Sequence, residues 1–116
     1  MEMDSAIVTL GALAQETRLS IFRALVRAHS PKDGEGGLAA GEISEQLDVA
    51  AATLSFHLKE MSHAGLVTSR RDGRSIIYKA NLDAMRGLTD FLLEDCCKGA
   101  CGIVSNHRNQ KQRECA

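Results

Sequence analysis

Residues 41–80, GEISEQLDVAAATLSFHLKEMSHAGLVTSRRDGRSIIYKA, decide the fold of this chain. Apolar residues recur at helical spacing in 41–48 and, after a tight break, again in 51–64. The apolar positions are Ile43 and Leu47 in the first segment and Leu54, Leu58 and Met61 in the second. Gly65 follows the second segment, and glycine is the residue that most often ends a helix. The stretch therefore predicts two short helices joined by a tight turn.

The apolar period changes from helical to alternating in 66–80. Val67 and Tyr78 alternate with polar neighbours on either side of Asp72-Gly73, and Asp-Gly is favoured in two-residue hairpin turns. Helix, tight turn, helix and hairpin follow one another in a winged helix-turn-helix. The fold class that we predict is therefore mainly α with a small β-hairpin, and the second helix of such a unit enters the major groove of DNA.

The outer side of the second helix is expected to present side chains that suit DNA. Thr53 and Ser55 can bond base edges or phosphates, and Lys59 supplies positive charge. Phe56 can contact a thymine methyl group, and His57 can donate to a phosphate or a purine acceptor. The alternative is an ordinary amphipathic helix with a solvated polar face, although an exposed Phe56 argues against it.

The predicted hairpin tip is strongly basic. With Asp72-Gly73 as the turn, Arg71 and Arg74 lie directly opposite one another, and like charges paired across strands are destabilising. Arg70 and Lys79 are expected at the same end of the molecule. Phosphates would compensate such a cluster. The alternative is a solvated sheet edge kept basic to prevent aggregation.

The bulk composition sets the remaining limits. The chain has 116 residues, a net charge of −1, 44% hydrophobic residues and only 3% aromatic residues, which predicts one domain with an aliphatic core. No apolar run approaches the ~20 residues needed to cross a bilayer, and no signal peptide is recognisable. We therefore expect a cytoplasmic protein with reduced thiols and no membrane partner.

Helices are also predicted on both sides of this unit, over 4–13, over 16–28, and from Asn81 or Asp83 to about Cys97, with a loop at 30–37. Each of these helices has an expected apolar face. The residues are Ile7, Leu10, Leu13 and Ala14 for the first, Leu19, Phe22, Leu25 and Val26 for the second, and Leu82, Met85, Leu88, Phe91, Leu92 and Leu93 for the last. The first and last helices carry more apolar residues than one core requires, so we expect them to form a homodimer. Such a dimer binds half-sites about 34–36 Å apart in an imperfect inverted repeat of operator DNA. The expected domains are 1–97, for DNA binding and dimerisation, and 98–116, a cysteine-containing segment with a flexible tail.

Residues 94–102, EDCCKGACG, hold three of the four cysteines. Neighbouring helical residues point about 100° apart, so Cys96 and Cys97 cannot face one partner within a regular helix. Gly99 and Gly102 permit a tight reversal that would let three sulfurs converge.

Three soft sulfurs favour a thiophilic centre. Structural zinc normally takes four ligands, whereas trivalent arsenic or antimony takes three and keeps a lone pair. His107 is a candidate fourth ligand for zinc, in a polar tail. Cysteines that merely pack remain an alternative, whereas a catalytic pair would prefer Cys-x-x-Cys. Cys115 receives no role.

Three stretches resemble the ArsR/SmtB family of metal-responsive bacterial repressors: QETRLSIFRAL (15–25), ATLSFHLKEMSHAGLV (52–67) and SRRDGRSIIYKA (69–80). The resemblance covers about residues 5–97. It implies a dimeric winged helix-turn-helix repressor that releases the operator of a resistance operon when a toxic ion binds.

Members of the family hold their sensor sites at different positions, so each known site is compared with the matching residues of this sequence. The Cys-x-Cys arsenic site of the family is absent from AAGEISEQLDVA (39–50), and the Asp-x-His zinc site is absent because Ala84 and Met85 follow Asp83. The remaining match is the subgroup with a vicinal cysteine pair at the end of the last helix and a third cysteine after it, which responds to arsenite and antimonite. The matching positions are Cys96, Cys97 and Cys101, although the gap before the third cysteine is shorter here.

The resulting interpretation is an As(III)- or Sb(III)-responsive repressor of an arsenic resistance operon, with the metalloid as inducer and no catalytic cofactor. Two alternatives keep the fold: a repressor selective for methylarsenite through the vicinal pair alone, and a thiol redox sensor. A thiol enzyme such as an arsenic reductase is disfavoured, because no phosphate-binding glycine loop or acid–base pair surrounds the cysteines.

Overall fold

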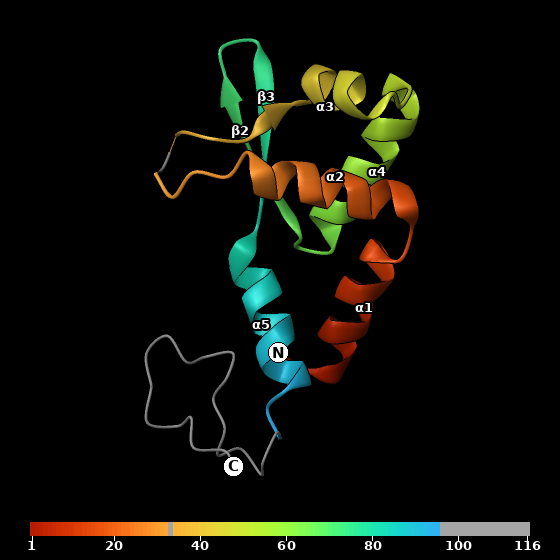
Figure 1. Cartoon of the computed structure of the whole chain (residues 1–116), viewed down its shortest axis with the longest axis vertical. Helices are drawn as coiled ribbons and strands as arrows, with labels where there is room; N and C mark the ends of the chain where they lie inside the picture. Colours follow the sequence, from red (N-terminus) through yellow and green to blue (C-terminus); the bar gives the residue numbers. More distant parts are fainter. Residues whose placement is uncertain (33, 96–116) are drawn as a thin grey trace.

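A computed structural model describes residues 1–32 and 34–95. These described residues form five helices and a small sheet, arranged as in Figure 1. The elements are α1 (Met3–Leu13), α2 (Glu16–Arg27), β1 (Leu38–Ala39), α3 (Ala40–Leu47), α4 (Ala51–His63), β2 (Val67–Asp72), β3 (Ser75–Ala80) and α5 (Leu82–Leu92). This arrangement confirms the predicted winged helix-turn-helix. None of the helices in this part of the chain is long and apolar enough to cross a membrane.

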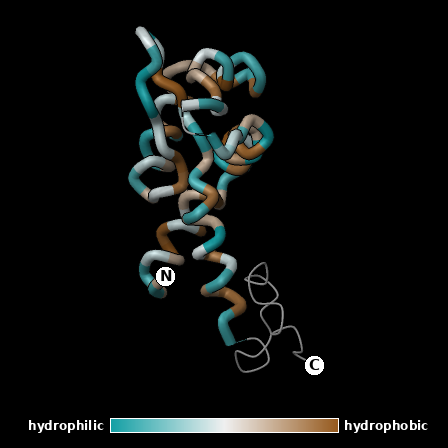
Figure 2. The backbone as a smooth tube through the Cα atoms, turned by 90° about the vertical axis from the view of Figure 1, so that its left-hand side faces the viewer, coloured by the Kyte–Doolittle hydropathy of each residue, from teal (hydrophilic) through white to brown (hydrophobic). Residues whose placement is uncertain are grey.

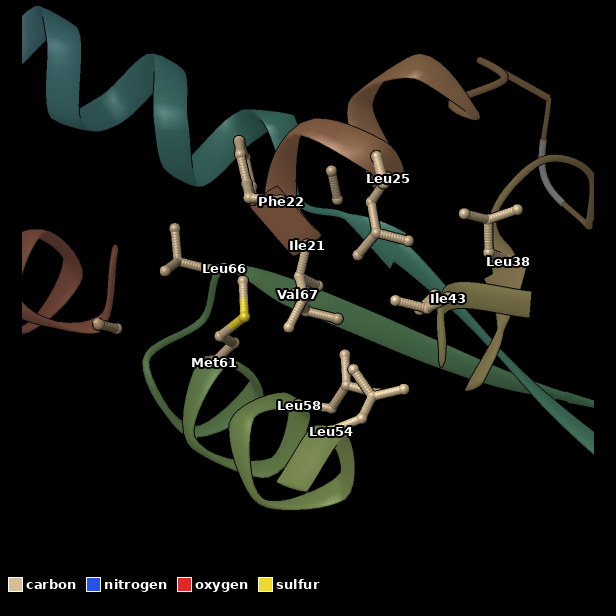
Figure 3. Packing of buried hydrophobic residues seen from close by; sticks show 13 residues of the cluster. Ile21, Phe22, Leu25, Leu38, Ile43, Leu54, Leu58, Met61, Leu66 and Val67 are labelled. Atoms are coloured by element: carbon tan, nitrogen blue, oxygen red, sulfur yellow. The ribbon is translucent and has the colours of Figure 1, made fainter. Parts of the chain in front are cut away.

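The core lies between α2, the two helices of the helix-turn-helix and the sheet (Figure 3). It is aliphatic, as the composition predicts. The fully buried large side chains are Ile21, Leu25, Ile43, Leu54, Leu58, Met61 and Leu66. The predicted stripe of α4 therefore faces the core, and α2 covers it from the other side. On α2, however, Leu19 and Val26 are exposed, so the buried face of that helix is narrower than predicted.

The sheet has three antiparallel strands in the order β1-β3-β2. The sequence did not reveal β1, which is only two residues long and pairs Leu38 with Tyr78. The strand follows Gly37, whose φ is +93° and whose added Cβ would lie 2.5 Å from the carbonyl oxygen of Tyr78. Only glycine fits such a close approach to β3, so Gly37 sets the position of β1.

The hairpin turn is displaced by one residue from the predicted position. Asp72 is not a turn residue but pairs with Ser75, so the two turn residues are Gly73 and Arg74. Gly73 has a φ of +66°, and glycine in the first central position is typical of a type II′ turn. Arg71 consequently pairs with Ile76, and the prediction that Arg71 faces Arg74 is wrong.

The first and last helices extend away from the winged unit (Figure 1). The face of α1 that packs inward consists of the small residues Ala6, Thr9 and Ala12. Of the apolar face expected for this helix, Ile7 and Leu10 are not covered by the core, since they are 59% and 44% exposed. Figure 2 shows hydrophobic segments along both of these helices.

The last helix starts at Leu82 and ends earlier than predicted. Asn81 caps it, since the Asn81 side-chain oxygen accepts a hydrogen bond from the backbone N–H of Ala84 at 3.3 Å. The regular helix ends at Leu92 rather than near Cys97. Of its predicted apolar face, Leu88 is buried, whereas Leu92 is 55% exposed.

Candidate nucleic-acid interface

The turn between α3 and α4 is fixed by backbone geometry and side-chain bonds. Asp48 ends α3 in the left-handed conformation, with φ +55°, which aspartate tolerates better than most residues. The Ser44 hydroxyl donates to the carbonyl oxygen of Val49 at 2.6 Å. At the other end of α3, the Glu42 carboxylate accepts a hydrogen bond from the N–H of Ala39 at 2.8 Å. These contacts hold α3 in place so that α4 can present its outer side.

The outer side of α4 carries four of the five predicted side chains. Thr53, Ser55, Phe56 and Lys59 are all exposed. Phe56 is 56% exposed although it is large and apolar. Burying such a ring on a partner is favourable, so the face is suited to contact with a base methyl group as well as with polar base edges.

The fifth predicted side chain, His57, is placed differently. Its exposed fraction is only 9%, and its Nδ1 accepts a hydrogen bond from Nε of Arg18 at 3.0 Å. Burial, and to a lesser extent the positive charge of Arg18, lower the pKa of His57 from its ordinary value of 6.5. The expectation that His57 lies on the exposed face is therefore wrong. Its spacing gives the reason: it lies three residues after Leu54 and four before Met61, which are both buried.

Sequence analysis also missed Arg18 as a residue of this region. It is a charged residue outside the apolar face expected for 16–28, yet it is only 8% exposed. Its guanidinium carbon lies 5.8 Å from the centroid of the Phe56 ring, within the usual range of a cation–π contact. No sequence signal pairs it with α4, because Arg18 and His57 are 39 positions apart.

The wing divides its cations into two groups. Arg71 and Arg74 are exposed at the tip. Arg70 is half-buried, and its Nη1 donates to the carbonyl oxygen of Gly36 at 3.1 Å. Lys79 pairs with Thr68 at the base of the hairpin, where Nζ donates to the carbonyl oxygen of Ser30 at 3.1 Å. The prediction that Lys79 belongs to the tip cluster is therefore wrong, and Lys79 instead ties the wing to the loop after α2.

The predicted thiol site lies outside the described residues. This holds for its three members, Cys96, Cys97 and Cys101, and also for His107 and Cys115. Within residues 1–32 and 34–95 there is no group of three or more His, Cys, Asp or Glu side chains that could hold a metal ion.

Comparison with known proteins agrees with this geometry. Residues 13–70 match the family described as "Helix-turn-helix domain". The transcriptional activator HlyU of Vibrio cholerae is 31% identical over 100 residues, which cover 84% of this chain and 85% of the relative. A putative arsenical resistance operon repressor, ArsR, of Halobacterium salinarum is 38% identical over 80 residues, which cover 69% of this chain and 57% of the relative.

A solved structure supports the same assignment. An ArsR-like transcriptional regulator from Rhodococcus sp. RHA1 superposes with a TM-score of 0.68 at 25% identity, over 97% of this chain and 93% of that chain. The shared helix-turn-helix region, the wing and the regulator relatives lead to one conclusion. This chain belongs to the ArsR/SmtB family of winged helix-turn-helix transcriptional regulators.

Proposed function

We propose that this chain is a homodimeric repressor of an arsenic resistance operon. It releases operator DNA when As(III) or Sb(III) binds the thiolates of Cys96, Cys97 and Cys101. The metalloid is the inducer, and its three hydroxyl or water ligands leave as three sulfur bonds form. Three thiolates complete the coordination of trivalent arsenic, whereas structural zinc would require a fourth ligand.

The observation that carries this proposal is where α5 ends. The regular helix ends at Leu92, and the described chain reaches Asp95, the residue before the vicinal cysteines. Leu92 and Leu93 are 55% and 44% exposed at this end. A metalloid that gathers the cysteines would therefore act directly on an apolar surface at the end of α5.

We assign that surface to the dimer interface. Apolar side chains on α1 are exposed as well, with Met3, Ile7 and Leu10 at 62%, 59% and 44%. Monomeric proteins rarely leave such a group of apolar side chains in water. A two-fold contact would bury this patch on both protomers at once, because the patch of one protomer packs against the same patch of its partner.

DNA binding follows from the two copies of α4. In the proposed complex, Thr53, Ser55, Phe56 and Lys59 face the major groove. Phosphates bind the wing residues Arg70, Arg71 and Arg74, with one N–H group of Arg70 already engaged by Gly36. A shift of α5 changes the distance between the two α4 helices, and half-site spacing is geometrically fixed. A coupling of about 1–3 kcal/mol would weaken DNA binding about 5- to 150-fold.

The relatives support the regulator class more strongly than the inducer. The Halobacterium protein is named as an arsenical resistance repressor, but HlyU is named as a transcriptional activator. The inducer therefore needs a direct test. A duplex selected from a random-sequence pool provides the DNA probe, and a gel shift is then titrated separately with arsenite, antimonite, methylarsenite and peroxide.

We expect arsenite and antimonite to release the duplex from the wild-type chain. Cys96→Ser should bind the duplex normally and resist release, whereas the matched control Cys115→Ser should respond like the wild type. Normal release of Cys96→Ser by arsenite would refute the site. Release by peroxide alone, with a mass loss of two hydrogens, would instead support a redox sensor.

A further inference from the structure

A side chain from outside the helix-turn-helix contacts two neighbouring residues of α4. Arg18, near the start of α2, donates from Nε to Nδ1 of His57 at 3.0 Å. Its guanidinium carbon also lies 5.8 Å from the centroid of the Phe56 ring. The two rings of α4 are 5.8 Å apart and tilted by 59°. Arg18 thus contacts one residue of the outer face and one of the buried face of the same helix.

The hydrogen bond determines which ring nitrogen of His57 carries the proton. A guanidinium carries only donors, so Nδ1 of the imidazole must be the acceptor. The ring proton then resides on Nε2, and a second proton on Nδ1 would break the bond. Lysine does not reproduce both contacts of Arg18, because its ammonium lies one atom further along the side chain than Nε and lacks the planar guanidinium that stacks on an aromatic ring.

The contact to Phe56 restrains an exposed ring. Phe56 is 56% exposed, so the core does not fix its orientation. The guanidinium of Arg18, which is only 8% exposed, lies over the Phe56 ring. Ordering a side chain before it binds DNA removes part of the entropic cost of binding.

We infer that Arg18 is a positioning residue for DNA recognition: it holds His57 in one tautomer on the buried face of α4 and orients Phe56 for contact with a base. This role rests on the proposed mode of DNA binding. It predicts that Arg18 contributes to the preference for one DNA sequence, beyond the general attraction of a positive charge to phosphates.

The first measurement needs no DNA. Nitrogen-15 spectra of the histidine rings in the full chain should show His57 as the Nε2–H tautomer at neutral pH. Arg18→Met, and equally Arg18→Lys, should abolish that fixed tautomer. A wild-type His57 that carries its proton on Nδ1, or an unchanged tautomer in both variants, would overturn the inference whatever the chain does to DNA.

The second measurement compares two arginines of one helix. Arg23 is exposed on α2, so Arg23→Met removes the same charge without touching the contact with His57. Affinity is measured for the selected duplex and for a scrambled one, and the ratio of the two affinities is the readout. We expect Arg18→Met to lower this ratio about tenfold, a typical effect for coupled neighbours, whereas Arg23→Met leaves it within about twofold.

Thermal melting shows whether each variant is folded. If Arg18→Met does not fold, Arg18→Lys keeps the charge and carries the comparison. Equal ratios in the Arg18 and Arg23 variants, or full recovery of the ratio in Arg18→Lys, would refute the positioning role while leaving DNA binding intact. A wild-type chain that prefers no duplex would refute the proposed function itself, and the histidine spectra would still report the contact.

Discussion

The unit from α2 to β3 and the pair formed by α1 and α5 differ in how far they bury their large apolar side chains. In the first region, Ile21, Leu25 and Ile43 are completely shielded from water. In the second region, the inward face of α1 uses small residues, and large ones such as Ile7 remain 59% exposed. The first region completes its own core, whereas the second leaves large apolar side chains exposed on the surface that we propose for the dimer.

This difference separates the two tasks of a regulator of this kind. A well-packed unit keeps the reading helix rigid, because close-packed cores tolerate little rearrangement. An interface between chains can instead adopt two arrangements, and allosteric change commonly uses such contacts. Cys96, Cys97 and Cys101 follow α5 in the sequence, and α5 belongs to the second region, which is the one that we expect to move.

Truncation of the core should have the largest effect. Leu25→Ala removes a completely buried side chain and should lower the free energy of unfolding by about 2–5 kcal/mol. Leu10→Ala is the matched control, since Leu10 is 44% exposed. In dilute solution its cost should be below about 1 kcal/mol, as expected for a surface position. Urea titration of both variants checks the contrast, and equal losses would mean that α1 is as well packed as the central unit.

A charge on the exposed face of α1 should have the next largest effect. Ile7→Asp places two carboxylates in the proposed two-fold interface, one from each protomer, and charged groups are costly to bury. The dimer should be destabilised by about 2 kcal/mol or more, while the fold of each chain is retained. Analytical ultracentrifugation over a range of concentrations measures this change. The exposed Arg27→Asp on α2 is the control, and dimers of unchanged strength in Ile7→Asp would place the interface elsewhere.

The central unit was also the easier region to predict from sequence. Its helices bury one face each, so Leu54, Leu58 and Met61 revealed their role by spacing alone. The same rule could not decide α1, because periodicity identifies an apolar face but not whether the chain itself or a partner covers it. Only the exposure of Ile7 and Leu10 shows that this chain's own core does not cover them.

The candidate site was predicted in part. The exposed residues of α4 and the two arginines at the tip followed from the motif and from charge, but the turn position and the location of Lys79 depend on strand register. Contacts between distant segments were not predictable either. Arg18 reaches His57 across 39 positions, and only the packing of α2 on α4 brings them together.

The pH dependence of stability provides a finer test of that contact. The pKa of His57 is lowered in the folded chain, so below pH 6.5 the unfolded chain binds this proton more readily than the folded chain does. The stability that neutral, buried His57 contributes is therefore complete above pH 6.5, and it is lost as the pH falls toward the lowered pKa of His57 in the folded chain. His57→Asn keeps an acceptor for Arg18 but does not titrate. Its free energy of unfolding should fall less steeply with acid than that of the wild type, and identical slopes would contradict the lowered pKa.

The smallest effect distinguishes the two regions by a single methyl group. Gly11 in α1 and Gly41 in α3 are both exposed, and a Cβ added at either would meet nothing within 4 Å. Alanine stabilises a helix relative to glycine, so Gly41→Ala should raise the free energy of unfolding by about 0.5–1 kcal/mol at any protein concentration. Gly11 lies four residues after Ile7, on the face that we assign to the dimer. Gly11→Ala should match that gain in dilute solution and lose part of it at concentrations where dimers form, because the partner occupies the space. An equal gain at every concentration would show that no partner covers this face of α1.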